Sequence, residues 1–301
     1  MSIPILLFVY NRLNHTRRTV ESLLANQDIS QHELIVFSDG PKTVVDSSSV
    51  NQVRDFIATI KGFQSVTVHC SKINKGLSRS IIDGVTQVLK QFDSCIVIED
   101  DLVLSPHFLS FMRDGLSKYS ADSRVASIHG YVFPTDSVLP TNFFMKGTDC
   151  WGWGTWKRAW DLFEPDGSKL LEQLKKRGLM NEFDFGGSYA YSGLLKKQIE
   201  EKVDSWAIRW HASIFLENML TLYPGKSLVH NIGNDRSGTN SGQYNIFDVS
   251  LQKSPLPVAD IEVEPSEFGY KAFVEFFTKN RQTLSAKVIR KISSLVNHEK
   301  E

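Results

Sequence analysis

Short apolar runs alternate with longer segments of helical periodicity through the first third of the chain. The apolar runs predict strands at 3–9, 34–37, 66–70 and 95–98, and the periodic segments predict helices at 16–27, 50–60 and 77–92. Each run is apolar throughout instead of at alternate positions, which is typical of strands covered on both faces. The pattern therefore predicts βαβ units and an α/β fold, in which helices flank a mostly parallel sheet.

Polar residues directly follow three of these predicted strands. Asn11 and Arg12 come after the first strand, Asp39 comes after the second, and an acidic triplet at 99–101 comes after the fourth. In open α/β sheets, ligands bind beyond the carboxyl ends of the strands. We therefore expect these side chains to line one site.

The second half of the chain is less regular. It contains a Gly/Trp segment at 151–156, helical patterns near 169–177 and 206–219, and a polar loop at 231–242 whose composition fits a segment that closes over a ligand. There is no obvious linker before about Pro255. We predict one domain over 1–255 and a C-terminal helical extension over 256–301.

The composition is that of an ordinary globular protein. Lys and Arg number 34, Asp and Glu number 34, and 41% of residues are hydrophobic. Nucleic acid is not an expected partner, because broad phosphate neutralisation needs a basic excess. Cys70, Cys95 and Cys150 form no CxxC pair, which favours reduced, buried thiols in a cytoplasmic protein. The sequence predicts neither a signal peptide nor a run of the ~20 apolar residues that a membrane-spanning helix requires.

The acidic triplet, Glu99, Asp100 and Asp101, needs a compensating cation, because adjacent carboxylates repel one another and burial raises the cost of their charge. Mg²⁺ and Mn²⁺ suit oxygen ligands and keep open positions for phosphate oxygens. The alternative is a solvated turn in which Asp101 caps the next helix.

Four motifs, taken in order, resemble those of GT-A glycosyltransferases. The sequence Ile-Glu-Asp-Asp-Leu-Val-Leu-Ser-Pro-His-Phe at 98–108 looks like the EDD form of the DxD motif, especially in the N-acetylglucosaminyltransferase I type, and is similar to bacterial family-two sugar transferases. Residues 4–12 and 37–40 resemble the nucleotide-binding turns of this family, and 74–79 resembles the segment that leads into the DxD strand. The resemblance covers roughly residues 3–240. It implies a GT-A fold with a nucleotide-binding half at 1–128 and an acceptor-binding half at 129–255.

The same resemblance implies roles for residues at the strand ends. Asp39 would contact the nucleoside base, Asn11 and Arg12 would line the same pocket, and Arg79 would belong to the donor-binding set.

Within the triplet, the resemblance implies that Asp100 faces the ribose or sugar of the donor and that Asp101 ligates the metal that bridges two phosphates. Glu99 would contact the donor or orient its neighbours.

The Gly/Trp segment resembles one that lines the sugar and acceptor region in these enzymes. Trp151 and Trp153 are the candidates for ligand contact, because indole faces stack on sugar rings. Trp156 and Trp160 are expected in the core.

Transfer of a sugar to a hydroxyl needs a base near the acceptor. Asp204 is the candidate, since Asp204-Ser-Trp resembles the D-D-W segment that carries the base in similar inverting enzymes. Ser205 replaces one acid, which leaves Glu200, Glu201 and Glu217 as alternatives, and Asp204 would equally suit a helix N-cap.

Two basic side chains in and before the polar loop complete the candidate site. His230 follows an apolar stretch and is a candidate metal ligand, with a purely structural role as the alternative. Arg236 would reach the diphosphate if the loop closes.

The segment 277–298 has five basic residues, no acid, and apolar residues at helical spacing. Such an amphipathic helix suits an anionic membrane surface, while packing on the body of the protein is the alternative.

The sequence therefore predicts an inverting, metal-dependent glycosyltransferase of surface polysaccharide synthesis that uses Mn²⁺ or Mg²⁺. We expect a nucleotide-diphosphate sugar, a UDP-sugar first, as its donor, a glycan or lipid-linked acceptor, and a cytoplasmic location with peripheral contact at the inner membrane. The alternatives are a nucleotidyltransferase, which should have a glycine-rich loop after the first strand, and a non-catalytic sugar-binding protein of the same fold.

Overall fold

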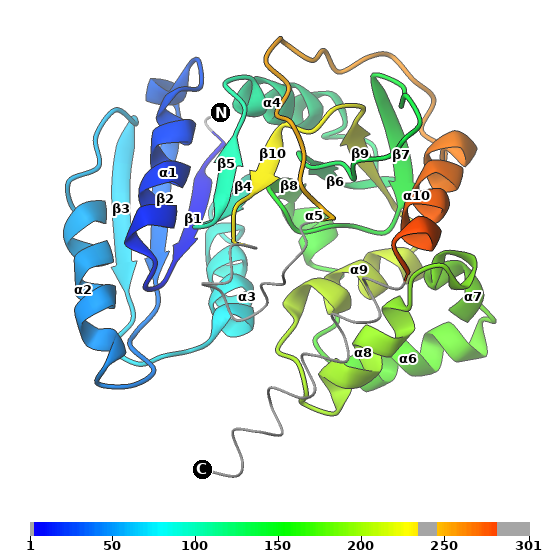
Figure 1. The fold of residues 1–301 in the computed structure, drawn as a ribbon, viewed down its shortest axis with the longest axis horizontal. Helices are drawn as coiled ribbons and strands as arrows, with labels where there is room; N and C mark the ends of the chain where they lie inside the picture. The colour runs from blue at the N-terminus through cyan, green and yellow to red at the C-terminus, as the bar shows by residue number, and fades with distance from the viewer. Residues whose placement is uncertain (1–2, 234–245, 282–301) are drawn as a thin grey trace.

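The computed structural model describes residues 3–233 and 246–281, and its described part is an α/β fold built on a large, mostly parallel sheet (Figure 1). Eight of the described strands form this sheet in the order β3-β2-β1-β4-β8-β6-β9-β7. They are β1 (Ile5–Val9), β2 (Glu33–Ser38), β3 (Ser65–Cys70), β4 (Ser94–Glu99), β6 (Val125–His129), β7 (Asn142–Lys146), β8 (Trp153–Trp156) and β9 (Leu220–Pro224). The predicted fold class is confirmed.

Strands β1 to β4 are parallel, and helices connect them. The connecting helices are α1 (Leu13–Leu24), α2 (Asp46–Ile57) and α3 (Leu77–Val88). Every strand and helix predicted in this third of the chain is present, although α1 begins and ends three residues earlier than expected and α3 ends four residues earlier. Parallel pairing brings the carboxyl ends of β2, β1 and β4 to one edge of the sheet.

The sheet buries both of its faces, as the apolar strands predicted. In β1, Ile5 and Leu7 pack with α1, α2 and α4 (Phe108–Lys118), whereas Leu6 and Phe8 pack with α3 and the tryptophans of the second half. Edge strand β3 is an exception, because most of its residues are exposed. Cys70 lies on it and is exposed, so the expectation that the thiols are buried is wrong for this cysteine; Cys95 is buried, Cys150 is half-buried, and all are free.

In the second half of the sheet, β8 runs antiparallel between β4 and β6. The helices of this half are α5 (Lys157–Trp160), α6 (Gly167–Lys176), α7 (Met180–Phe183), α8 (Tyr191–Ile199) and α9 (Trp206–Leu216), with the short 3₁₀ turn η2 (Phe185–Gly187). A second 3₁₀ turn, η1 (Ile29–Gln31), lies in the first half, between α1 and β2. The helices predicted near 169–177 and from Trp206 are both present.

A small two-stranded sheet ties the acidic triplet to the second half of the chain. Strand β5 (Leu102–Leu104) follows the triplet directly and pairs antiparallel with β10 (Val229–Asn231). The alternative in which Asp101 caps a helix is therefore wrong, since a strand comes next and α4 begins only at Phe108.

The predicted C-terminal helical extension is present as α10 (Glu267–Lys279). Its residues Phe273, Phe276 and Phe277 belong to the main hydrophobic core. The rest of the predicted basic helix, from residue 282 onward, lies outside the described residues. No helix in the described part of the chain combines the length and apolar character needed to span a bilayer.

Two helical glycines provide a paired test of this packing. A Cβ at Gly84, in α3, would lie 2.8 Å from Phe8 Cε1 and Cζ, whereas a Cβ at Gly193, in α8, meets its nearest neighbour, Ala190 Cβ, at 3.5 Å. We expect Gly84→Ala to lower the free energy of unfolding by about 1–3 kcal/mol through overpacking. Gly193→Ala should raise it by up to about 1 kcal/mol through helix propensity. Urea denaturation measures both, and a Gly84→Ala variant as stable as wild type would contradict the close packing of α3 on β1.

Candidate functional site

A cleft of about 490 Å³ opens at the carboxyl ends of β1, β2 and β4. Its lining residues come from both halves of the chain, and most are polar. They are Phe8, Val9, Tyr10, Asn11, Arg12, Phe37, Asp39, Lys42, Asn74, Gly76, Leu77, Ser80, Glu99, Asp100, Asp101, Trp151, Asn231 and Gly233. Three polar groups that were expected to meet, Asn11 with Arg12, Asp39, and the acidic triplet, thus share one cavity.

Arg12 links the two aspartates of the triplet. Its Nη2 donates to Asp100 Oδ1 at 2.9 Å and to Asp101 Oδ2 at 2.8 Å, and the backbone N–H of Tyr10 donates to Asp100 Oδ2 at 3.2 Å. The contacts form because β1 and β4 are adjacent and parallel, so Arg12 and the triplet leave the sheet side by side. We call this arrangement the arginine clamp.

The clamp offsets only part of the cost of burying these acids. Burial raises the pKa of Asp100 to about 6, although Arg12 acts in the opposite direction. For Glu99, burial and the neighbouring charges of Asp101 and Asp100 raise the pKa well above its usual range. Because these carboxylates are costly to keep ionised, binding of a cationic group would stabilise the site.

The backbone around the triplet is held from both sides. Thr19 Oγ1, in α1, donates to the carbonyl of Asp100 at 2.9 Å, and the N–H of Ile232 donates to the carbonyl of Asp101 at 2.8 Å. A Cβ at Gly233 would overlap the carboxylate of Asp101, so a larger residue here would displace that carboxylate. Gly233 and its neighbour Asn231 were not predicted as site residues, although a glycine two residues after a strand is a signal for close backbone approach.

Asp39 organises the loop at 74–76 beneath the cleft. Its carboxylate accepts hydrogen bonds from the backbone N–H groups of Gly40, Lys75 and Gly76, at 2.8–3.1 Å, and from Asn74 Nδ2 at 3.1 Å. The side chain is thus satisfied by the protein itself. The contact of Asp39 with a nucleoside base stays a prediction. In this structure its hydrogen bonds hold the loop at 74–76, which forms part of the cleft wall.

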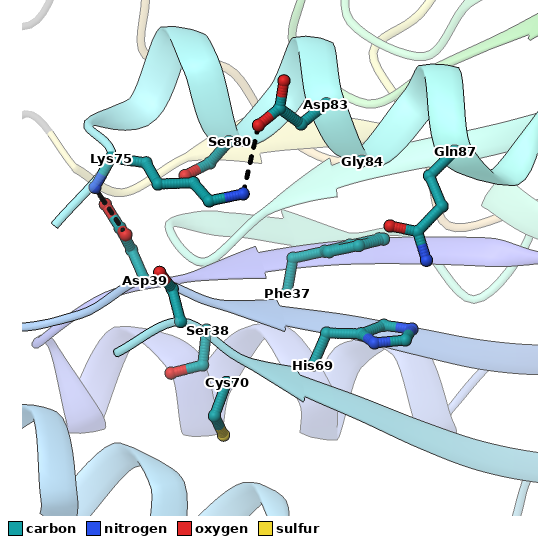
Figure 2. A pocket seen from close by; sticks show the side chains of 11 residues that line it. Phe37, Ser38, Asp39, His69, Cys70, Lys75, Ser80, Asp83, Gly84 and Gln87 are labelled. Carbon is teal, nitrogen blue, oxygen red and sulfur yellow. Dashed lines mark hydrogen bonds and ion pairs between the residues drawn. The ribbon is translucent and has the colours of Figure 1, made fainter. Parts of the chain in front are cut away.

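A second, smaller pocket of about 160 Å³ adjoins this wall (Figure 2). Phe37, Asp39 and Ser80 line both cavities. In the smaller pocket, Lys75 Nζ lies 3.0 Å from Asp83 Oδ2, and the rings of Phe37 and His69 stack with centroids 5.1 Å apart. The cleft therefore continues past Asp39 along the β2–β3 side of the sheet.

Two predicted donor-binding residues lie differently from one another. Asn11 lines the cleft, where its Nδ2 lies 3.5 Å from Asp46 Oδ1. Arg79 does not line it: its side chain is 75% exposed and 3.7 Å from Asp83. The donor contact of Arg79 stays a prediction that this structure does not support, because the turn of α3 directs Leu77 and Ser80 toward the cleft and Arg79 toward solvent.

The structure separates the two tryptophans proposed for ligand contact. Trp151 lines the cleft. Trp153 is fully buried and packs against Trp160, Trp206 and Trp210, so its expected ligand contact is wrong. It occupies a strand position that faces the core, whereas Trp151 precedes β8. Trp156 and Trp160 are buried, as predicted.

His230 lies outside the cleft. Side chains alternate along a strand, so Asn231 faces the cleft and His230 lies on the other side of β10, with Nε2 2.6 Å from Asp248 Oδ1. The metal-ligand role of His230 stays a prediction, and the observed position of its side chain does not support it. Within 3–233 and 246–281, no three His, Cys, Asp or Glu side chains converge as a ready-made metal site.

The segment around Asp204 lies at the rim of the cleft. A Cβ at Gly76, which lines the cleft, would stand 3.2 Å from Asp204 Oδ2. Asp204 is exposed and is not the N-cap, because Ser205 Oγ accepts from the N–H of Ile208 and caps α9. Its role as base stays a prediction, and Arg236 lies outside the described residues.

No protein-family model and no curated protein sequence matches the chain. Among solved structures, it is similar to the mannosyltransferase PcManGT from Pyrobaculum calidifontis, in complex with GDP-Man and Mn²⁺, with 12% identity and a TM-score of 0.31 over 44% of this chain and 35% of that one. It is also similar to TarS of S. aureus, with 12% identity and a TM-score of 0.33 over 50% of this chain and 25% of TarS. The chain thus matches well under half the length of either protein.

The network around Asp39 yields a test of stability. Asp39→Asn replaces one acceptor oxygen with an N–H₂ group that faces backbone donors, so we expect a loss of about 1.5–3 kcal/mol in the free energy of unfolding. Asp83→Asn, which breaks only the exposed ion pairs with Lys75 and Arg79, should cost less than about 1 kcal/mol. Urea denaturation of the two variants checks the difference, and equal effects would remove the organising role of Asp39.

Proposed function

We propose that the chain is a glycosyltransferase of the GT-A type whose cleft binds a nucleotide-diphosphate sugar. The observation that carries this proposal is the arginine clamp at the carboxyl end of β4, where the DxD-like triplet meets the residues that follow β1. A diphosphate is the ligand that such a site favours, because the cleft also contains the side-chain amides of Asn11 and Asn231 as hydrogen-bond donors.

The oxygen ligands of the cleft suit Mg²⁺ or Mn²⁺. In such sites one protein carboxylate and the phosphates of the substrate bind the ion together. Asp101 is the residue that would hold the ion, because its carboxylate lies at the surface of the cleft beside Gly233. When bound, the ion supplies positive charge for the departing diphosphate.

The protein's own residues have separate tasks in this proposal. Arg12 offsets part of the negative charge of Asp100 and Asp101 before the donor arrives and contributes a fixed cation near the phosphates. Lys42, at the mouth of the cleft, is a second cation. Asp39 holds the Asn74–Gly76 backbone in place through its hydrogen bonds.

The finer features expected from the sequence belong to the same proposal. They are inversion at the anomeric carbon, a UDP-sugar donor of the hexosyl or N-acetylhexosaminyl kind, a glycan or lipid-linked acceptor, and action in surface polysaccharide synthesis at the cytoplasmic side of the inner membrane. A nucleotidyltransferase is less well supported, because the turn after β1 contains no glycine and leads straight into α1.

Titration calorimetry with UDP and GDP, each with and without Mn²⁺, tests the donor site. We expect Mn²⁺-dependent binding of one nucleotide to the wild-type chain. Asp101→Asn should weaken that binding by about tenfold or more, equivalent to about 1.4 kcal/mol, and should leave metal-free binding nearly unchanged. Asp114→Asn, which alters an exposed acid of α4, is the control. Absence of nucleotide binding under all conditions would contradict the proposed function, and equal binding with and without Mn²⁺ would contradict the metal assignment.

A further inference from the structure

An aromatic pocket of about 230 Å³ lies beside the cleft and shares Trp151 with it. We use the name for the cavity whose aromatic walls are Phe133, Trp151, Tyr189, Tyr191, Phe247 and Phe277. These rings belong to segments far apart in the sequence that the fold brings together. A concave site with aromatic walls and a few polar groups is a typical small-molecule site.

Polar atoms without protein partners lie among these rings. Thr148 and His211 line the pocket, and among the described residues Thr148 Oγ1 and His211 Nε2 are buried and have no hydrogen-bond partner. A ligand that presents hydroxyl groups to Asp149 and apolar C–H faces to the rings fits this lining. Carbohydrate is the chemical class that has both properties.

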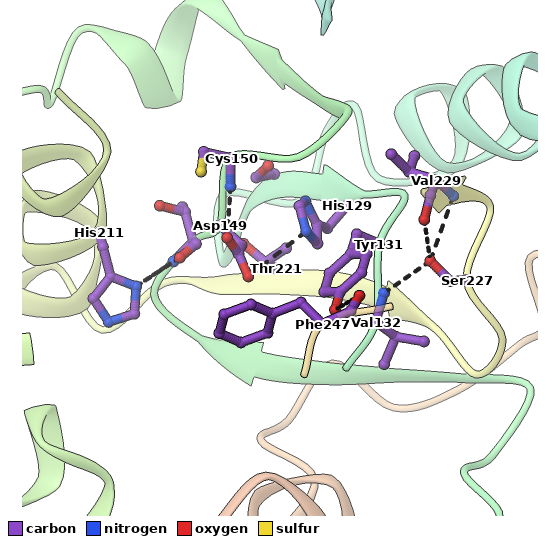
Figure 3. A network of polar contacts seen from close by, with 12 residues as sticks. His129, Tyr131, Val132, Asp149, Cys150, His211, Thr221, Ser227, Val229 and Phe247 are labelled. Atoms are coloured by element: carbon purple, nitrogen blue, oxygen red, sulfur yellow. Dashed lines mark hydrogen bonds and ion pairs between the residues drawn. The ribbon is translucent and has the colours of Figure 1, made fainter. Parts of the chain in front are cut away.

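Asp149 is the acid that lines this pocket. Figure 3 shows its contacts with Cys150 and His129. Asp149 lies between β7 and β8, where its Oδ1 accepts from the N–H of Cys150 at 2.8 Å and its Oδ2 stands 3.7 Å from His129 Nε2. The side chain is 19% exposed, so it is largely shielded but reachable. His129 is fully buried, and burial lowers its pKa to about 3, so it is a neutral neighbour of the carboxylate.

Cys150 lies close enough to Asp149 and to the acidic triplet to feel both. Burial raises the pKa of its thiol, and the charges of Asp149, Glu99 and Asp101 raise it further. A ligand in the aromatic pocket is thus next to a ligand at the triplet, with Trp151 common to both sites.

Asp204 does not line the aromatic pocket, although the next residue does. Ser205 lines the pocket, but its hydroxyl caps α9. Asp204 is exposed beside Gly76. Asp149 therefore has the burial and position that a base for a pocket-bound hydroxyl requires.

We infer that the aromatic pocket binds the acceptor sugar and that Asp149 is the general base of the transfer. This inference rests on the proposed function. The acceptor oxygen attacks the anomeric carbon of the donor, and the new C–O bond forms as the bond from that carbon to the diphosphate oxygen breaks. The hydroxyl proton passes to the Asp149 carboxylate, and the electron pair of the broken bond leaves with the nucleoside diphosphate.

The titration of this base should be visible in the rate. Burial raises the pKa of Asp149 to about 6. The groups that face it are His129, Cys150, Tyr131, Tyr189, Tyr191 and Tyr223, and burial keeps each of them uncharged near that pH. A base acts only when ionised, so the transfer rate should fall as the pH drops below about 6.

The first experiment compares Asp149→Asn with Asp204→Asn in the full chain. Transfer is measured with Mn²⁺ from UDP-glucose, UDP-N-acetylglucosamine or GDP-mannose to octyl glycosides of glucose, galactose, mannose and N-acetylglucosamine. We expect Asp149→Asn to lose about 10²- to 10⁴-fold in kcat while it binds nucleoside diphosphate as wild type does. Asp114→Asn, which alters an exposed acid of α4 outside both cavities, is the control; its rate should stay within about threefold of wild type and it should retain the acidic limb of the pH profile.

The second experiment measures binding alone. Ala207 is half-buried and lines the pocket from α9, so Ala207→Phe should fill the cavity without removing a core side chain. Saturation-transfer NMR with the same octyl glycosides, in the presence of nucleoside diphosphate and Mn²⁺, should show at least one that binds wild type and is lost in Ala207→Phe. Thermal melting confirms that the variant is folded.

Three results would overturn the inference: no octyl glycoside binds the wild-type chain, Ala207→Phe binds them unchanged, or Asp149→Asn transfers within about threefold of the wild-type rate. A rate lost in Asp204→Asn and kept in Asp149→Asn would assign the base to Asp204. Failure of the wild-type chain to bind any nucleoside diphosphate would instead contradict the proposed function, and a glycoside that still bound the pocket would then mark it as a sugar site without a transferase.

Discussion

The site depends on how the charge of three adjacent carboxylates at the end of a buried strand is compensated. Arg12 contacts Asp100 and Asp101, and Glu99 is left with a raised pKa and no cation of its own among the described residues. This compensation works only if β1 and β4 are neighbours and parallel, because the chain after β1 must run past the triplet. Because breaking a buried pair leaves an uncompensated charge, the sheet order and the site stabilise each other.

The first third of the fold can be predicted from the sequence, because the local pattern of apolar and polar positions determines its strands and helices. Strands β1 to β4 are apolar runs bounded by polar turns, and their parallel order follows from the helices between them. Parallel order in turn brings Arg12, Asp39 and the triplet to one edge, so the pattern of apolar and polar positions is enough to predict this half of the site. The pattern does not assign the charge of Arg12 to the triplet, because a metal alone could compensate the same carboxylates.

The residues that sequence reasoning misplaced depend on side-chain direction or on long-range pairing. Trp153 and Trp151 are two positions apart, yet one is in the core and the other at the cleft, because the chain turns at Gly152 with φ +65° before β8 begins. His230 is the neighbour of Asn231, which lines the cleft, so its side chain lies on the opposite face of β10. Local sequence does not specify that β10 pairs with β5, so it does not specify which of its side chains faces the triplet.

The position of β8 explains why the cleft and the aromatic pocket are adjacent. Because β8 runs antiparallel beside β4, the segment that enters it, residues 148–152, passes the carboxyl end of β4 and the triplet. Thr148, Asp149 and Cys150 line the aromatic pocket, and Trp151 lines both cavities. A strand inserted parallel would enter from the opposite edge, so one reversal of strand direction places an acid and an aromatic wall beside the acidic triplet.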